Sequence, residues 1–172
     1  MRIASGQKRK KFFRLNSPFS DDMVINCIAI DSKDNIWIGS DGLIKYDGKN
    51  FSLYNSANSP IPEDFVHSIN IDAQENLWFA SSRFQSGGVV KFDGIDTWNI
   101  FTRENSTLPG DLVSSIAIAG NDIWVGLNNS VNDIRLVKLT NGKITEYSEE
   151  QFGFKPYYLG NSCTDSHNLF IQ

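Results

Sequence analysis

The sequence contains few of the residues that form metal sites and disulfides, and it has no long apolar run. Its 172 residues include two cysteines, two histidines and five prolines. The cysteines, Cys27 and Cys163, lie in separate apolar segments and indicate neither a disulfide framework nor a compartment. No apolar run approaches the ~18 residues of a membrane helix, and residues 1–20 lack the apolar segment of a signal peptide. We therefore expect no membrane span.

Charge is distributed unevenly along the chain. Six of the 16 Lys and Arg residues lie within residues 1–14, and all 20 Asp and Glu residues lie beyond them. Residues 1–11 are expected to form a basic, flexible tail. The acidic remainder is a poor match for a phosphate backbone, so no nucleic-acid partner is expected. A hydrophobic content of 40% and an aromatic content of 12% exclude a disordered chain.

A short aromatic motif recurs along the chain and defines its architecture. The segment Asn35–Gly39 reappears as Asn76–Ala80 and Asp122–Gly126, and a weaker copy is Asn168–Gln172. Successive aromatic positions are 41, 46 and 46 residues apart. These positions are Trp37, Trp78, Trp124 and Phe170.

Other landmarks repeat with the same period and divide each unit into four short strands. Gly42–Gly48 matches Gly88–Gly94, and Asn58–Val66 matches Asn105–Val113. In the first unit the expected strands lie near residues 28–30, 37–38, 43–46 and 51–54, with Asp-Gly pairs and Pro-rich segments between strands. No window predicts a helix. Four short strands repeated in this way are typical of a β-propeller blade, so the fold class is all-β.

The repeat boundaries predict about three complete blades, near residues 21–63, 64–110 and 111–156. Residues 157–172 resemble the first two strands of another blade, and residues 12–16 align with Phe51–Asn55, the last strand of a blade. Residues 12–172 are thus expected to form a partial propeller. Its open ends could close a ring of four blades, close a ring of about eight with a second copy, or belong to a longer propeller. The last two arrangements are favoured, and the second would make a homodimer.

The combined motif resembles the two-component regulator propeller repeat. The likeness is carried by Trp37–Gly39, Leu43–Gly48, Phe51–Tyr54, Gly88–Gly94 and Asn105–Ile116. It implies a sensor propeller of a bacterial hybrid two-component system, often linked to polysaccharide use. It therefore implies a non-enzymatic binding module that acts in signal transduction, without a cofactor, in the periplasm. The residues themselves leave the compartment open.

A weaker likeness points to an enzyme. Gly142–Tyr147 together with Asn76–Phe79 is similar to the repeats of streptogramin lyase propellers. This likeness implies a metal-assisted lyase with a catalytic histidine, for which His67 is the candidate. The competing interpretation is a tolerated polar residue, because the equivalent positions hold Asn26 and Ser114. No spacing of His, Cys and Asp predicts a metal site.

The tryptophans and the loops offer different candidates for ligand binding. Trp37, Trp78, Trp124 and Phe170 recur in every unit, which favours packing between blades over sugar stacking. The loop between the second and third strands varies: it is Ser40-Asp41 in the first unit but longer at residues 81–87 and 127–135. Insertions of one loop class fall on one face of a propeller. They predict binding of an oligosaccharide or other small polar ligand by Arg83, Phe84, Gln85, Asn128 and Asn129. A protein-interaction scaffold is the remaining alternative.

Overall fold

The structure is a computed structural model that describes residues 18–20, 22–84, 86–130, 133–148, 151, 162–164 and 169–171. Its secondary structure is built from antiparallel strands, which form three four-stranded sheets and one strand pair. In each sheet the strands follow one another in sequence order. The predicted all-β architecture is confirmed. The expected tail at residues 1–11 and the expected strand at residues 12–16 lie outside the described residues.

The strands of the three sheets have the following bounds. The first sheet consists of β1 (Cys27–Ile30), β2 (Ile36–Ser40), β3 (Gly42–Tyr46) and β4 (Phe51–Tyr54). The second consists of β5 (Val66–Ile71), β6 (Leu77–Arg83), β7 (Ser86–Phe92) and β8 (Trp98–Phe101). The third consists of β9 (Val113–Ala119), β10 (Asp122–Ser130), β11 (Asp133–Thr140) and β12 (Lys143–Tyr147). A last pair, β13 (Ser162–Thr164) and β14 (Leu169–Ile171), follows, and β13 contacts β9.

Aspartates that follow a strand organise the turns locally. The Asp47 carboxylate accepts hydrogen bonds from the main-chain N–H groups of Lys49 (2.8 Å) and Asn50 (2.6 Å). Asp93 does the same for Ile95 (2.8 Å) at the equivalent turn of the second sheet. These are Asx turns, in which a short acidic side chain replaces a main-chain acceptor. The repeated aspartates at these positions therefore shape hairpins.

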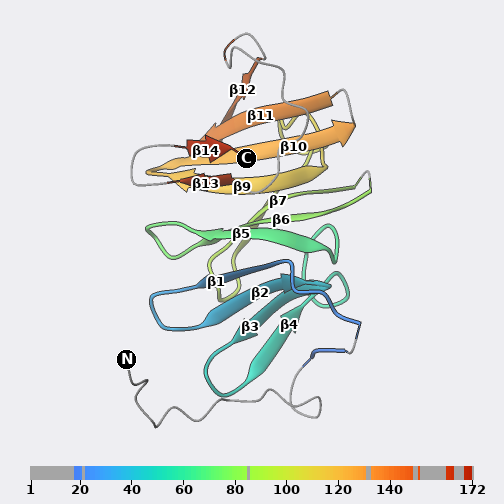
Figure 1. Cartoon of the computed structure of the whole chain (residues 1–172), viewed down its shortest axis with the longest axis vertical. Helices are drawn as coiled ribbons and strands as arrows, with labels where there is room; N and C mark the ends of the chain where they lie inside the picture. Colours follow the sequence, from blue (N-terminus) through green and yellow to red (C-terminus); the bar gives the residue numbers. More distant parts are fainter. Residues whose placement is uncertain are drawn as a thin grey trace, which may run out of the picture.

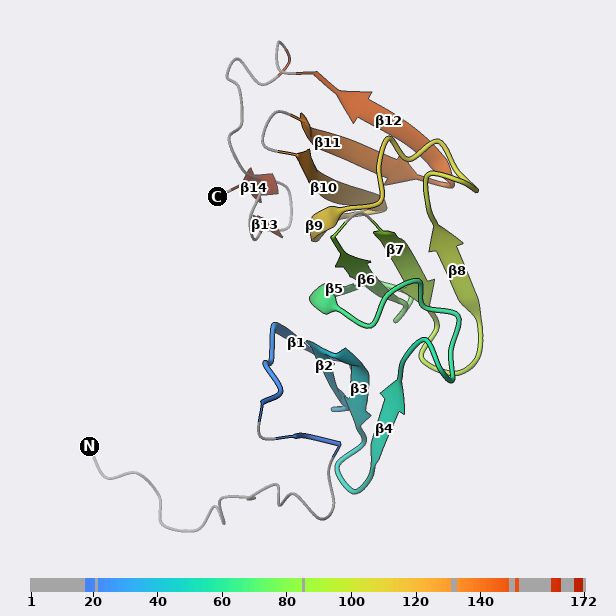
Figure 2. The ribbon, with the colours of Figure 1, turned by 90° about the vertical axis from the view of Figure 1, so that its right-hand side faces the viewer.

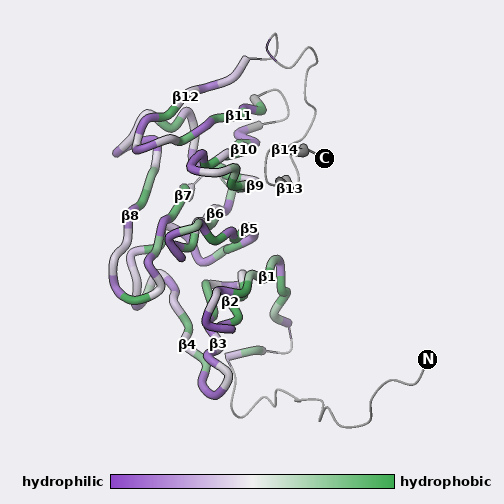
Figure 3. The backbone as a smooth tube through the Cα atoms, turned by 90° about the vertical axis from the view of Figure 1, so that its left-hand side faces the viewer, coloured by the Kyte–Doolittle hydropathy of each residue, from purple (hydrophilic) through white to green (hydrophobic). Residues whose placement is uncertain are grey.

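The sheets are stacked side by side, with β1, β5 and β9 along one edge and β4, β8 and β12 along the other (Figures 1 and 2). Hydrophobic stretches concentrate in the strands, and hydrophilic ones in many of the turns (Figure 3). The second sheet is covered on both faces, so Leu77–Ala80 is buried without the alternation of a half-exposed strand. Because side chains alternate across a sheet, Leu77 and Phe79 pack towards the first sheet, whereas Trp78 and Ala80 pack towards the third.

Aromatic rings fill the space between the first and second sheets, which we call the aromatic junction. Trp37 is 1% exposed and lies edge-to-face against Phe92 of the second sheet, with ring centroids 6.0 Å apart. Phe92 stacks on Trp98 at 3.7 Å, and Tyr54 packs beside both rings. The two sheets approach each other closely at Gly39, where a Cβ would lie 2.8 Å from the Val66 carbonyl oxygen.

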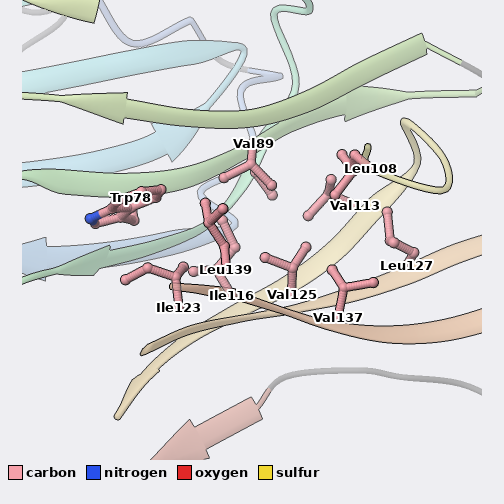
Figure 4. Close-up of a cluster of buried hydrophobic side chains, with 11 residues drawn as sticks. Trp78, Val89, Leu108, Val113, Ile116, Ile123, Val125, Leu127, Val137 and Leu139 are labelled. Carbon is pink, nitrogen blue, oxygen red and sulfur yellow. The ribbon is translucent and has the colours of Figure 1, made fainter. Parts of the chain in front are cut away.

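Hydrogen bonds supplement an aliphatic core between the second and third sheets, which we call the hydrogen-bonded junction. In Figure 4, side chains of the second sheet face those of the third. The buried cluster consists of Trp78, Ala80, Val89, Leu108, Val113, Ile116, Ile123, Val125, Leu127, Val137 and Leu139. Across it, Asn70 Nδ2 donates to the Ile116 carbonyl (2.7 Å), and the Ile116 N–H donates to Ser68 Oγ (3.0 Å).

Candidate functional site

A cavity of about 560 Å³ opens at the hydrogen-bonded junction, at the end of the sheets where the β6–β7 hairpin turns. Its walls come from the first residues of β5 and β9 and from the residue before β1, and we call these three strands the inner strands. The connections that lead into β5 and β9 and the ends of β6 and β10 complete the walls. The lining residues are Asn26, Phe65, His67, Ser82, Arg83, Phe84, Leu112, Val113, Ser114 and Asn128. The cavity therefore brings together Arg83, Phe84 and Asn128 of the expected binding residues with His67, the candidate of the enzyme alternative.

The β6–β7 hairpin presents an aromatic ring at the rim of this cavity. Phe84 is 78% exposed, and its φ of 59° lies in the left-handed region that a bulky residue rarely adopts. The Arg83 guanidinium carbon lies 5.2 Å from the centroid of the Phe84 ring. At the base of the hairpin, Ser86 Oγ donates a hydrogen bond to the Glu63 carboxylate. The Glu63 N–H donates to Ser81 Oγ (3.1 Å), which ties the hairpin to the preceding connection.

His67 links the second sheet to the third. Its ring Nε2 donates a hydrogen bond of 2.6 Å to the carbonyl oxygen of Val113, which also accepts a hydrogen bond from Ser82 Oγ (2.8 Å). Asn26, the equivalent residue of the first unit, donates through Nδ2 to the carbonyl oxygen of Val66 (3.0 Å). Both side chains therefore make the same bond to the next inner strand.

The environment of His67 favours the neutral ring. Burial lowers its pKa below the ordinary value of 6.5, and this effect outweighs the carbonyls of Val113 and Phe65, which act in the opposite direction. Because Nε2 carries the hydrogen in the bond to Val113, Nδ1 is the acceptor of the neutral ring. Nδ1 is enclosed and has no hydrogen-bond partner among the described residues.

The other candidate residues of the loops are separated. Asn129 lies in a smaller cavity of about 300 Å³, together with Arg103, Gly110 and Arg135. The main-chain N–H of Asn128 donates to the Leu112 carbonyl (3.0 Å) and so fixes the end of β10 at the cavity wall. Gln85 lies outside the described residues, as does His167. Ser114 differs from Asn26 and His67, because its hydroxyl donates within its own sheet to Gly126 (3.1 Å).

The repeated tryptophans do not line this cavity, and Trp124 differs from Trp37 and Trp78 in its environment. The indole Nε1 of Trp37 donates to Asp31 Oδ2 (3.0 Å), and that of Trp78 donates to Asp72 Oδ2 (2.9 Å). Both rings are buried. Trp124 is half-buried beside Tyr147, with ring centroids 5.0 Å apart, and its unit has Ala119 in place of the aspartate. Phe170 belongs to β14, and its side chain lies outside the description.

A lysine of the neighbouring strand covers each tryptophan. Lys45, Lys91 and Lys138 place Nζ at 4.8, 5.3 and 5.6 Å from the ring centroids of Trp37, Trp78 and Trp124. Each lysine pairs directly with its tryptophan in the sheet register. The faces of Trp37 and Trp78 are therefore occupied within the protein and are not available for sugar stacking.

A second cavity, of about 540 Å³, lies at the opposite end of the same junction. It borders Trp78, Lys91 and Leu139. The cross-strand pair Phe92–Trp98 of the second sheet corresponds to Leu139–Ile144 of the third. Smaller side chains at this pair leave the space that aromatic rings fill in the aromatic junction.

Sequence reasoning missed several residues of the site and of its junction. Phe65 and Leu112 line the cavity from the two connections, and Ser68 and Asn70 form hydrogen bonds across the junction. A signal was present for Asn70 and Ser68, because the equivalent positions of the first unit are Ala29 and Cys27. A change from small apolar to polar residues within an inner strand indicates a new hydrogen-bond partner.

The described residues contain no group of three or more His, Cys, Asp and Glu side chains that could hold a metal ion. Within the same residues, no helix is long and apolar enough to cross a membrane.

Comparison with known proteins supports the propeller assignment. Residues 18–42 match the profile of the two component regulator propeller, which confirms the resemblance of the repeat. The fold is similar to that of the extracellular domain of the putative one component system BT4673 from B. thetaiotaomicron (TM-score 0.62, 20% identity). That alignment covers 88% of this chain and 19% of the other. No curated protein gave a significant match.

Two further structures extend the comparison. The extracellular domain of the putative hybrid two component system BT3049 from B. thetaiotaomicron matches with a TM-score of 0.61 and 19% identity, over 74% of this chain and 17% of the other. XC5397 from Xanthomonas campestris, a gluconolactonase, matches with a TM-score of 0.60 and 11% identity, over 86% of this chain and 55% of the other. The chain thus spans about a fifth of the length of the two sensor-type structures. Its fold is that of β-propeller blades.

Proposed function

We propose that this chain is a non-enzymatic sensor module that binds a small polar ligand, such as an oligosaccharide, in the cavity beneath Phe84. The observation that carries the proposal is the exposed Phe84 ring, held in a left-handed backbone conformation at the rim of a cavity. Such a conformation costs about 1–3 kcal/mol in a bulky residue and is common at ligand sites. The similarity to extracellular domains of one- and two-component systems supports the sensor role.

The cavity suits a ligand of this kind. Its volume of about 560 Å³ falls within the range of small-molecule sites. Phe84 offers an apolar face, while Asn26, Ser114 and Asn128 line the wall with polar side chains. A saccharide has matching surfaces, because its C–H faces pack on aromatic rings and its hydroxyls form hydrogen bonds.

The enzyme alternative has less support. A similar fold occurs in the gluconolactonase XC5397. However, His67 uses Nε2 to bind the Val113 carbonyl, and its Nδ1 is enclosed. A general base must reach the proton that it removes, and a metal ligand must reach the metal. The equivalence of His67 with Asn26 supports a role in holding two sheets together.

A matched pair of variants tests the binding site. We expect Phe84→Gly to bind the best ligand of an oligosaccharide panel about tenfold more weakly. Its thermal midpoint should be unchanged or raised, because glycine adopts positive φ without strain. Ile95→Ala is the control, since Ile95 is 75% exposed on a turn outside the cavity. Unaltered binding by Phe84→Gly, or the absence of binding to any panel member, would overturn the proposal.

We also propose that a second copy covers the outer face of the first sheet. Ile28 of β1 is 58% exposed, whereas the equivalent Ile69 and Ile116 are 7% and 1% exposed beneath the preceding sheet, and Ile30 of β1 is 63% exposed. Val24 and Ile25 extend this apolar surface. Light scattering should give a dimer that Ile28→Lys dissociates, and a monomeric wild type would overturn this part of the proposal.

A further inference from the structure

We infer that the ligand is a sugar acid, whose carboxylate binds Arg83 while its hydroxyls bind the cavity wall. This inference rests on the proposed function of the same cavity and specifies the chemistry of its ligand. Three observations carry it: the absence of acidic side chains from the lining, the absence of an ion pair at Arg83 among the described residues, and the hydrogen-bond acceptors that remain on the wall.

The cavity beneath Phe84 differs in charge from its neighbours. None of its lining residues is Asp or Glu, although the chain contains 20 of them. By contrast, the second cavity is bordered by Asp72 as well as Lys91, and the cavity of about 300 Å³ by Asp111 as well as Arg103. Arg83 is the one permanently charged side chain of the lining, so the field in this cavity favours an anion.

Arg83 forms no ion pair with a carboxylate among the described residues, whereas Arg135 and Lys138 do. Arg135 Nη1 lies 2.8 Å from Glu146, and Lys138 Nζ lies 3.2 Å from Asp122. The Arg83 guanidinium is held against the Phe84 ring instead. A guanidinium can donate two parallel N–H bonds to one carboxylate, which a point-like ammonium cannot do.

Ser82, Ser114 and Asn26 keep acceptor oxygens on the wall, which suit hydroxyl donors of the ligand. The Ser114 hydroxyl uses its hydrogen on the Gly126 carbonyl, and that of Ser82 uses its hydrogen on Val113. Asn26 donates through Nδ2 to Val66, and its Oδ1 remains as an acceptor. A ligand that donates through hydroxyls, accepts through a carboxylate and packs a C–H face on Phe84 is a sugar acid. A uronate-containing disaccharide combines these features.

Calorimetric titration of the full chain with digalacturonic acid and with its dimethyl ester tests the inference. The two probes share their ring hydroxyls, and the ester replaces each carboxylate by an uncharged methyl ester group. We expect the wild type to bind the acid about tenfold more tightly than the ester, which is the effect of one charge-assisted hydrogen-bonded pair. Arg83→Gln should remove this preference, and Arg83→Lys should retain part of it.

Arg103→Gln is the matched control, because it removes the same charge from the connection that leads to β9, outside the cavity. It should keep the preference for the acid. Equal affinity of the wild type for both probes, or a loss of preference in both glutamine variants, would overturn the inference and leave the proposed function intact. Failure of every saccharide, acidic or neutral, to bind would overturn the proposed function itself.

Discussion

The two sheet junctions of this protein are built from the same repeat positions and share one side-chain hydrogen bond, from Asn26 or His67, but they differ in the rest of their contacts. In the aromatic junction, Trp37, Phe92 and Trp98 interlock, and Trp37 is almost fully enclosed. In the hydrogen-bonded junction, the corresponding pair is Leu139 and Ile144, and side chains of β5 bond to the main chain of β9.

This difference has a consequence for ligand binding. The rings of Trp37, Phe92 and Trp98 occupy space between the first two sheets that the smaller Leu139 and Ile144 do not occupy between the second and third. The cavity of about 540 Å³ lies between the second and third sheets, and the cavity of about 560 Å³ borders the same junction as well as Asn26 of the first sheet. Regular repeats thus provide the rigid scaffold, and departures from the repeat provide space for a ligand.

The largest expected effect comes from opening the aromatic junction. Trp37→Ala should reduce the free energy of unfolding by about 3–5 kcal/mol, because it leaves a cavity among well-packed rings. It also leaves Asp31 Oδ2 without its indole partner. Urea denaturation at neutral pH measures the loss. Trp124→Ala is the comparison, and it should cost about 1–2 kcal/mol, because Trp124 is half-buried. Equal losses at the two positions would contradict a special role of the aromatic junction.

A smaller effect, dependent on pH, distinguishes the hydrogen-bonded junction. Burial lowers the pKa of His67 below 6.5, so the unfolded chain takes up a proton at a higher pH than the folded one. The stability due to neutral His67 is therefore complete above about pH 6.5 and is lost as the pH falls through the folded pKa. The loss is at most about 1.4 kcal/mol per pH unit.

His67→Asn should abolish this pH dependence and leave the stability at pH 7.5 within about 1 kcal/mol of the wild type. Asparagine already makes the equivalent bond at position 26 (3.0 Å to Val66). The reciprocal variant, Asn26→His, should introduce a similar dependence at the aromatic junction. Urea midpoints measured between pH 5 and 7.5 give both results. An unchanged pH profile in His67→Asn would show that another group is responsible.

Much of the fold could be predicted from the sequence, because its determinants are local. The strand expected at residues 51–54 coincides with β4, and the one expected at residues 43–46 lies within β3. The hydrogen bonds between sheets were harder to foresee, since each acceptor is a main-chain carbonyl from another unit. The bonds of Asn26 and His67 span 40 and 46 residues, which is about one repeat period. The repeat period therefore predicts which strand supplies the acceptor carbonyl, whereas the identity of a single side chain does not.

The candidate site was predicted only in part. Loop insertions identified Arg83, Phe84 and Asn128, which line one cavity, but they placed Asn129 in the same group. Adjacent residues of an extended strand point to opposite sides, so Asn128 and Asn129 reach different cavities. The left-handed conformation of Phe84 had no sequence signal, because Gly, Asn and Asp are the residues that predict it.

The smallest expected effect comes from converting one junction into the other. The double variant Leu139→Phe with Ile144→Trp copies the pair Phe92–Trp98 into the third sheet, beside the second cavity. Rings placed there would bury additional apolar surface next to Trp78, and we expect a gain of about 1 kcal/mol in urea denaturation. Ligand binding beneath Phe84 should be unchanged, because the two cavities lie at opposite ends of the junction. A clear loss of stability would show that the hydrogen bonds of β5 and β9 hold the sheets too close together for aromatic rings, and that the two kinds of junction exclude each other.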